Sequence, residues 1–162
     1  MITLTLARAH HDTIRMERTC RASPARVFDA WRDVEARLRW SRPSPDVEIV
    51  YDKAEFRVGG EDVTRCGSAG DLRYVAKVRN LEIEDDRRIV FAEHVAEDGV
   101  SKAAALIDVT LAPVGRETRL ILTMQIAAFD STDMLHGYRQ GWTPALDNLA
   151  NELWDRETEH AT

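Results

Sequence analysis

Glu93 is the residue whose type and position could best support chemistry in this sequence. It lies in the alternating segment IVFAEHV and shares a face with Ile89, Phe91 and Val95, so alternation points its carboxyl toward an expected interior. Burial disfavours a charged carboxylate and raises its pKa, which suits the group to proton transfer. A second interpretation is more usual for a glutamate: the strand end is wet, and Glu93 is solvated or pairs with an arginine.

Three polar residues on alternate positions of the segment GEDVTRCG could give the same interior a polar end. If Asp62, Thr64 and Cys66 point inward, they can orient a bound molecule by hydrogen bonds. A shift of the strand by one residue would instead turn Val63 and Arg65 inward. The sequence leaves both registers open.

His136 and several aromatic residues complete the set of candidate site residues. His136 lies near the start of the last helix, where it could donate a hydrogen bond at a cavity mouth or simply lie on the surface. The aromatic residues could line a cavity wall, although ordinary core packing is the commoner role. They are Tyr74, Phe91, Tyr138 and Trp142, together with Phe56 and Trp40.

No other motif in the sequence indicates a known kind of catalytic or cofactor site. The spacing of His, Cys, Asp and Glu matches no zinc or iron site, so we expect no metal and no other cofactor. The glycine-containing segments RVGG and RCGSAG have neither a dinucleotide-binding nor a Walker pattern. No serine lies in a nucleophile-elbow sequence. The sequence therefore predicts no catalytic residue beyond the possible use of Glu93.

Composition and charge exclude several classes of partner. The formal net charge is −6, and acids are interleaved with the arginines, which argues against a nucleic-acid surface. No apolar stretch approaches the roughly 18 residues of a membrane span, and the first residues lack the apolar run of a signal peptide. We therefore expect a cytoplasmic protein with no membrane contact, in which Cys20 and Cys66 are reduced structural thiols.

Hydrophobic periodicity predicts one strand, two short helices, a run of antiparallel strands and a long terminal helix. A serine cap followed by proline starts the first helix within SPARVFDAWRD, and a second runs from about Val34 to Trp40. Residues 1–12 are either a strand extension or a loose arm, and 13–158 are expected to form a single domain. The predicted strands are 13–22, 47–52, 55–58, 61–67, 71–84, 87–97, 101–112 and 117–128, of which the second and third could be one bent strand.

The terminal helix, residues 131–157, carries one apolar stripe and three unusual residues. Pro144 lacks the N–H that would bond to Gln140, so we expect a kink or break near Gln140–Trp142. Gly137 and Gly141 each destabilise a helix by about 1 kcal/mol relative to alanine. Two explanations are open: the glycines let the helix approach the sheet closely beside Trp142, or they only mark a break between two helices.

An ordered set of segments resembles the START-like, helix-grip superfamily, which includes the birch-pollen allergen fold and polyketide cyclases. Within it, the chain is most similar to bacterial proteins related to the C-terminal domain of the activator of the heat-shock-protein-ninety ATPase. One segment departs from the family, because GGEDVTRCG is polar where alternating aromatics are frequent. The segments that carry the resemblance are RASPARVFDAWRD, FRVGG, LEIEDDRRIVFAE, DVTLAPVGRETRLILT and GWTPALDNLANEL.

The resemblance implies an α+β fold in which a curved antiparallel sheet of six or seven strands wraps around the long C-terminal helix. It also implies a cavity between them, but no fixed catalytic motif. The leading hypothesis is therefore the binding of a small, largely apolar molecule. One alternative is a cyclase- or dehydratase-type enzyme that uses a buried carboxyl. Another is a co-chaperone-like domain with a chaperone partner, and an exposed edge strand could support a homodimer.

Overall fold

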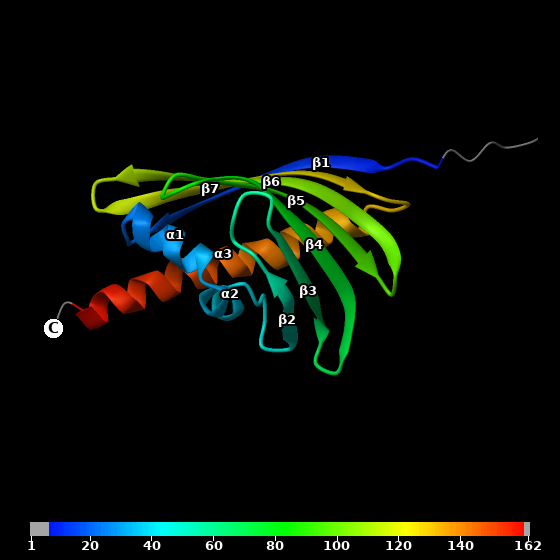
Figure 1. Ribbon diagram of the computed structural model, residues 1–162, viewed down its shortest axis with the longest axis horizontal. Coiled ribbons are helices and arrows are strands. Elements are labelled where there is room, and N and C mark those ends of the chain that lie inside the picture. The colour runs from blue at the N-terminus through cyan, green and yellow to red at the C-terminus, as the bar shows by residue number, and fades with distance from the viewer. Residues whose placement is uncertain (1–6, 161–162) are drawn as a thin grey trace, which may run out of the picture.

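The chain folds into a seven-stranded antiparallel sheet that curves around a long C-terminal helix, with two short helices after the first strand (Figure 1). The computed structural model describes residues 7–160, with side chains as far as Trp154. This architecture confirms the predicted α+β helix-grip fold. Of the uncertain segment 1–12, His10 to Asp12 belong to the first strand, whereas residues 1–6 lie outside the described residues.

The strand order is β1-β7-β6-β5-β4-β3-β2, so the first strand joins the far edge of a sheet built from consecutive hairpins. The bounds of α2, β4 and β7 are those predicted from the sequence, and the other shared elements differ by a few residues at their ends. The elements are β1 (His10–Cys20), α1 (Pro24–Arg32), α2 (Val34–Trp40), β2 (Val47–Ala54), β3 (Glu61–Ser68), β4 (Asp71–Glu84), β5 (Arg88–Glu97), β6 (Val100–Val114), β7 (Glu117–Ala128) and α3 (Asp133–His160).

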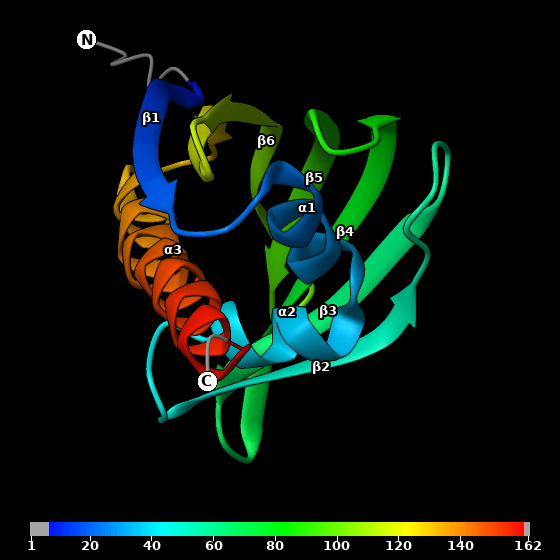
Figure 2. The ribbon, with the colours of Figure 1, turned by 90° about the vertical axis from the view of Figure 1, so that its left-hand side faces the viewer.

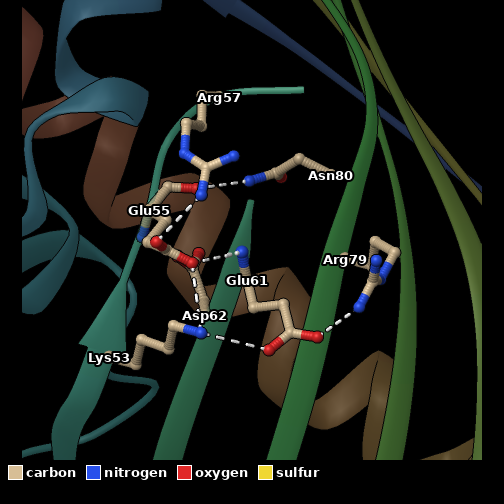
Figure 3. Close-up of polar contacts among 7 residues, drawn as sticks. All are labelled: Lys53, Glu55, Arg57, Glu61, Asp62, Arg79 and Asn80. Carbon is tan, nitrogen blue, oxygen red and sulfur yellow. Dashed lines mark hydrogen bonds and ion pairs between the residues drawn. The ribbon is translucent and has the colours of Figure 1, made fainter. Parts of the chain in front are cut away.

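The predicted strand at 55–58 is wrong, because this segment forms a tight turn between β2 and β3. The N–H of Gly60 donates to the carbonyl of Arg57 at 2.9 Å, and the side-chain amide of Asn80 donates to the carbonyl of Glu55 at 2.9 Å (Figure 3). A Cβ atom at Gly60 would lie 2.5 Å from the Glu55 carbonyl oxygen. The turn therefore requires glycine at this position.

The two short helices are capped as their sequences predict. The hydroxyl of Ser23 accepts from the N–H of Arg26 at 3.3 Å, and Pro24 occupies the first helical position of α1. The carboxylate of Asp33 accepts from the N–H of Glu35 at 3.0 Å and starts α2. Both helices lie on the concave side of the sheet beside α3 (Figure 2).

The apolar core lies between the inner face of the sheet and the three helices. α3 packs mainly along β1 and also contacts β7, α1 and α2. Its buried residues recur at three- and four-residue spacing, as the predicted stripe requires. The core includes Ile14, Phe91, Val95, Ile107, Val109, Leu111, Leu120, Leu122, Met124 and Ile126 from the sheet, and Tyr138, Ala145, Leu146, Leu149 and Leu153 from α3.

Of the kink or break expected near Gln140–Trp142, the break is wrong, because α3 runs without interruption from Asp133 to His160. A proline removes only one backbone hydrogen bond from a helix. Arg18 on β1 binds α3 on both sides of Pro144. Its guanidinium donates to the carboxylate of Asp147 at 2.7 Å and to the carbonyl of Thr143 at 3.3 Å. Tertiary contacts thus keep both sides of Pro144 in one helix.

The two helical glycines are explained neither by close packing nor by a break. A Cβ atom built at Gly137 or at Gly141 would meet nothing within 4 Å outside its own stretch of helix. The sequence-based idea that they let α3 approach the sheet is therefore wrong.

Gly137→Ala should raise the free energy of unfolding by about 1 kcal/mol, because alanine is the better helix former and Gly137 is exposed with free space around it. Urea denaturation followed by circular dichroism measures this change. Gly60→Ala is the matched control and should destabilise, since its new methyl group collides with the Glu55 carbonyl. A destabilised Gly137→Ala variant would contradict this account of the space around α3.

No helix in the described part of the chain is long and apolar enough to cross a bilayer.

Candidate functional site

The pairing of four neighbouring strands determines which polar side chains point inward. Asp62 of β3 pairs with Val78 of β4, Val78 with Glu93 of β5, and Glu93 with Ala105 of β6. Paired residues in an antiparallel sheet share a face. Ala105 belongs to the buried core, so this row faces α3. Of the two registers left open by the sequence, the structure has the one that turns Asp62, Thr64 and Cys66 inward.

Glu93 makes its hydrogen bond to the terminal helix. The hydroxyl of Tyr138 on α3, which is 5% exposed, donates to Oε1 of Glu93 at 2.8 Å. Burial raises the pKa of the Glu93 carboxyl, and the bond from Tyr138 only partly opposes that shift. Burial and the neighbouring carboxylate also raise the pKa of Tyr138. Glu93 is thus half-buried with a tyrosine partner, not with the arginine that the alternative interpretation proposed.

Asp62 points inward, but both of its oxygens hold structural hydrogen bonds. Oδ2 accepts from Arg37 on α2 at 2.8 Å, and the two side chains are 7% and 8% exposed. Oδ1 accepts from the N–H of Glu55 at 2.9 Å. Asp62 therefore ties α2, β3 and the 55–60 turn together, next to the surface ion pairs of Glu61 with Lys53 and Arg79 (Figure 3).

The remaining inward candidates on the sheet lie around Glu93 with different degrees of burial. Thr64, Cys66 and Tyr74 are half-buried, and Phe91 is 7% exposed within the core. Burial raises the pKa of the Cys66 thiol, and the charge of Glu93 adds to the shift. Burial also raises the pKa of Tyr74, with a further contribution from Glu97. At neutral pH both groups therefore keep their protons and can act as neutral hydrogen-bonding groups.

Two candidates on α3 lie apart from Glu93. His136 is exposed. The indole of Trp142 stacks on Trp31, with ring centroids 5.9 Å apart and planes inclined by 9°, and lies 6.5 Å from the ring of Trp40. Trp142 therefore belongs to a tryptophan cluster that joins α1, α2 and α3.

Gly141 borders an open space on the inward side of α3. It lies one turn after Tyr138 and one turn before Ala145, both of which are buried against the sheet. Gly141 itself is half-buried, yet an added Cβ atom there would meet nothing within 4 Å. A side chain added at Gly141 would therefore have room beside α3.

The molecule has two larger hollows, and Glu93 lines one of them. One, of about 760 Å³, is open and follows β1, β7, β6 and β5, where Thr13, Gln125 and the 42% exposed Leu106 belong to the outer face of the sheet. The other, of about 550 Å³, lies between Pro24 at the start of α1 and the turn at Asp86. The first hollow is also lined by Glu93 and Ala105 of the inward row, whereas neither hollow is lined by Tyr138 or Asp62.

Comparison with known families agrees with this architecture. The family model described as "Activator of Hsp90 ATPase homolog 1-like protein" matches residues 21–153. The chain belongs to this family. The resemblance inferred from the sequence is therefore confirmed, and it covers the strand end, helices and sheet that surround Glu93. A comparison with curated proteins finds no significant match.

Solved structures of bacterial proteins share the fold of this activator-homologue family member. A protein from Rhizobium loti is 35% identical, with 89% of this chain and 98% of that chain covered and a TM-score of 0.79. One from Rhizobium leguminosarum is 25% identical over 93% and 99% of the two chains, with a TM-score of 0.82. The AHSA1 protein from Silicibacter pomeroyi, at 21% identity, 90% and 99% coverage and a TM-score of 0.70, shows likeness of fold alone.

Sequence reasoning missed Arg37 and Tyr51, two polar residues that lie with Asp62 on the inner side of the sheet. The guanidinium of Arg37 lies 4.9 Å from the centre of the Tyr51 ring, and its Nε has no hydrogen-bond partner among the described residues. A signal for Arg37 exists, since it lies three residues before the buried Trp40 on the inward side of α2. An arginine in that phase indicates a buried ion pair.

Proposed function

We propose that residues 13–158 of this activator homologue form one domain that binds a small, largely apolar molecule between the inner face of the sheet and α3. The observation that carries the proposal is the free space at Gly141, on the inward side of α3 and beside the Glu93–Tyr138 pair. Binding pockets for small molecules combine apolar walls with a few polar groups. The inner face provides both.

Partly covered apolar side chains on β4 support the same proposal. Tyr74, Ala76 and Val78 pack against the core but remain half-buried. α3 lies along β1 at one side of the curved sheet, whereas β4 lies toward the other side (Figure 2). A ligand that covered these side chains would gain about 25 cal/mol for each Å² of apolar surface removed from water.

Gly141→Leu should weaken binding of the neutral fluorophore N-phenyl-1-naphthylamine by about tenfold or more, because the new side chain occupies the free space beneath α3. Fluorescence titration of the folded protein measures the affinity. Gln140→Leu adds the same side chain on the exposed side of α3 and should leave the affinity unchanged. Equal affinities in all three proteins, or no saturable binding by the unchanged protein, would refute the proposed function.

A second candidate function is acid–base catalysis by Glu93, which its raised pKa and its bond to Tyr138 favour. A protonated Glu93 could give its proton to the hydroxyl that leaves a β-hydroxy carbonyl compound as water, and the carboxylate so formed could take the proton from the α-carbon, which forms the double bond and restores the acid. Ultraviolet absorbance of the conjugated product measures such a dehydration. Turnover that Glu93→Gln abolishes would support this function, and its absence with every β-hydroxy ketone and ester tested would reject it.

The name of the family suggests a third possibility, an interaction with a chaperone ATPase. The match shows membership of the family, and the chaperone partner is a proposal for this chain. An ATPase assay of a bacterial Hsp90 with increasing amounts of the protein tests it. A rate of ATP hydrolysis that rises and saturates supports the interaction, whereas an unchanged rate rejects it.

A further inference from the structure

The Glu93–Tyr138 pair leaves one carboxyl oxygen available to a ligand. Oε1 of Glu93 accepts from Tyr138 at 2.8 Å, while Oε2 has no hydrogen-bond partner among the described residues. The free space at Gly141 begins three residues further along α3, which is about 4.5 Å along the helix axis. A molecule lying in that space would therefore have the unused oxygen within reach.

We propose that the ligand carries an uncharged oxygen acceptor, such as a ketone, ester or amide carbonyl, and that Oε2 of Glu93 donates a hydrogen bond to it. This inference rests on the proposed binding function and specifies the class of molecule. It assigns to Glu93 the role of recognition, with no bond made or broken. Tyr138 orients the carboxyl, because its hydroxyl donates to Oε1 and so leaves Oε2 as the oxygen that carries the proton.

Among the described residues, the charged groups near Glu93 are paired. Tyr138 on α3, Cys66 on β3 and Tyr51 on β2 are within electrostatic reach of Glu93. The charged side chains of the same region form ion pairs: Asp12 with Arg139 at 3.5 Å, Glu97 with Arg73 at 3.8 Å, and Asp62 with Arg37 at 2.8 Å. The neighbours of Glu93 in its own row, Val78 and Ala105, are apolar.

The charge of each group follows from its surroundings. Burial raises the pKa of Tyr51, Cys66 and Tyr138, so all three remain neutral near pH 7. Arg37 and Asp62 neutralise each other at 2.8 Å. An anionic ligand would thus find no unpaired cation, and a cationic ligand no unpaired carboxylate other than Glu93 itself. An uncharged acceptor matches such an interior best.

The protonation of Glu93 supports the direction of the hydrogen bond. Desolvation raises the pKa of this carboxyl, which shifts the group toward its neutral form. In that form Oε2–H is a hydrogen-bond donor, and a ligand carbonyl can accept from it.

Displacement of N-phenyl-1-naphthylamine by three matched molecules, 2-nonanone, nonane and nonanoate, tests the inference. The unchanged protein should bind 2-nonanone about tenfold more tightly than nonane, in line with one hydrogen bond, and should not prefer nonanoate. Glu93→Gln keeps a donor at this position and should keep the preference. Glu93→Leu should remove the preference while it leaves the affinity for nonane unchanged.

A pH titration separates recognition from a merely structural effect. As the pH rises and Glu93 ionises, the unchanged protein should lose its preference for 2-nonanone, whereas Glu93→Gln should show no such loss. Equal affinity for nonane and 2-nonanone, or a preference that Glu93→Leu retains, overturns the inference. If these molecules still bind and Gly141→Leu abolishes their binding, the proposed binding function stands, and only the hydrogen bond from Glu93 to the ligand is refuted. If none binds, the proposed function fails.

Discussion

Asp62→Ala should lower the free energy of unfolding by about 3–5 kcal/mol, because it breaks a buried ion pair from one side. Arg37 would keep its charge in a position that is only 8% exposed, with its Nε already lacking a partner among the described residues. The N–H of Glu55 would lose one of its two acceptors and keep the carbonyl of Glu61 at 3.1 Å. Guanidinium chloride denaturation followed by tryptophan fluorescence measures the loss.

Two further variants separate the charge from the hydrogen bond. Asp52→Ala removes the partner of Arg65 in an exposed ion pair and should cost less than about 1 kcal/mol. The double variant Arg37→Met with Asp62→Asn leaves no buried charge and keeps an acceptor for Glu55, so it should be more stable than Asp62→Ala. Equal effects of Asp62→Ala and Asp52→Ala would contradict the structural role of the buried pair.

Trp40→Ala should destabilise the protein by about 3–5 kcal/mol, the usual cost of removing a large buried aromatic side chain. Trp40 is 2% exposed, and its ring lies 4.8 Å from that of Trp31. Its Nε1 donates to the carbonyl of Ala30 at 2.9 Å. Since these contacts join α1, α2 and α3, their loss should be visible as a lower midpoint in thermal and in chemical denaturation.

Trp154→Ala provides the comparison for the same substitution at the surface. Trp154 is 43% exposed, and the guanidinium of Arg21 lies over its ring. Removing it should cost about 1 kcal/mol. Trp40→Phe should fall between the two alanine variants, because it keeps part of the ring packing and loses the hydrogen bond to Ala30. A Trp40→Ala variant no less stable than Trp154→Ala would show that the tryptophan cluster does not hold the helices.

The elements that follow from local chemistry could be predicted from the sequence. The extents of β4 and β7 came from alternation between clear turns, and the start of α1 from a serine followed by Pro24. The hairpin at Asp98 and Gly99 has positive φ at both residues, as the two-residue turn between β5 and β6 requires. In each case the residues that decide the structure are neighbours in the chain.

The sequence-based predictions were wrong where contacts between residues far apart in the chain determine the local structure. The 55–60 turn depends on Asn80, which is 25 residues from Glu55. The continuity of α3 past Pro144 depends on Arg18 of β1, and the space at Gly141 depends on the course of the whole sheet. Patterns in one segment carry no information about such contacts.

For the candidate site, too, the direction of a side chain could be predicted from the sequence but its partner could not. Alternation alone indicated that Glu93 points inward, and its position in the pairing of β5 with β4 and β6 agrees. Its partner Tyr138 is 45 residues away, and their meeting depends on how α3 is rotated about its axis. The pairing of Arg37 with Asp62 likewise joins a helix to a strand 25 residues later. Sequence patterns could nominate these side chains but could not pair them.

The closure of the fold by its two ends has a consequence for biosynthesis. β1 is made before its strand partner β7, and its Arg18 bonds to Asp147, 129 residues later. A chain emerging vectorially from the ribosome therefore exposes Ile14 and Cys20, the buried residues of β1, before their partners exist. Native structure can be completed only after β7 and α3 have been made, and contacts this far apart also favour slow folding.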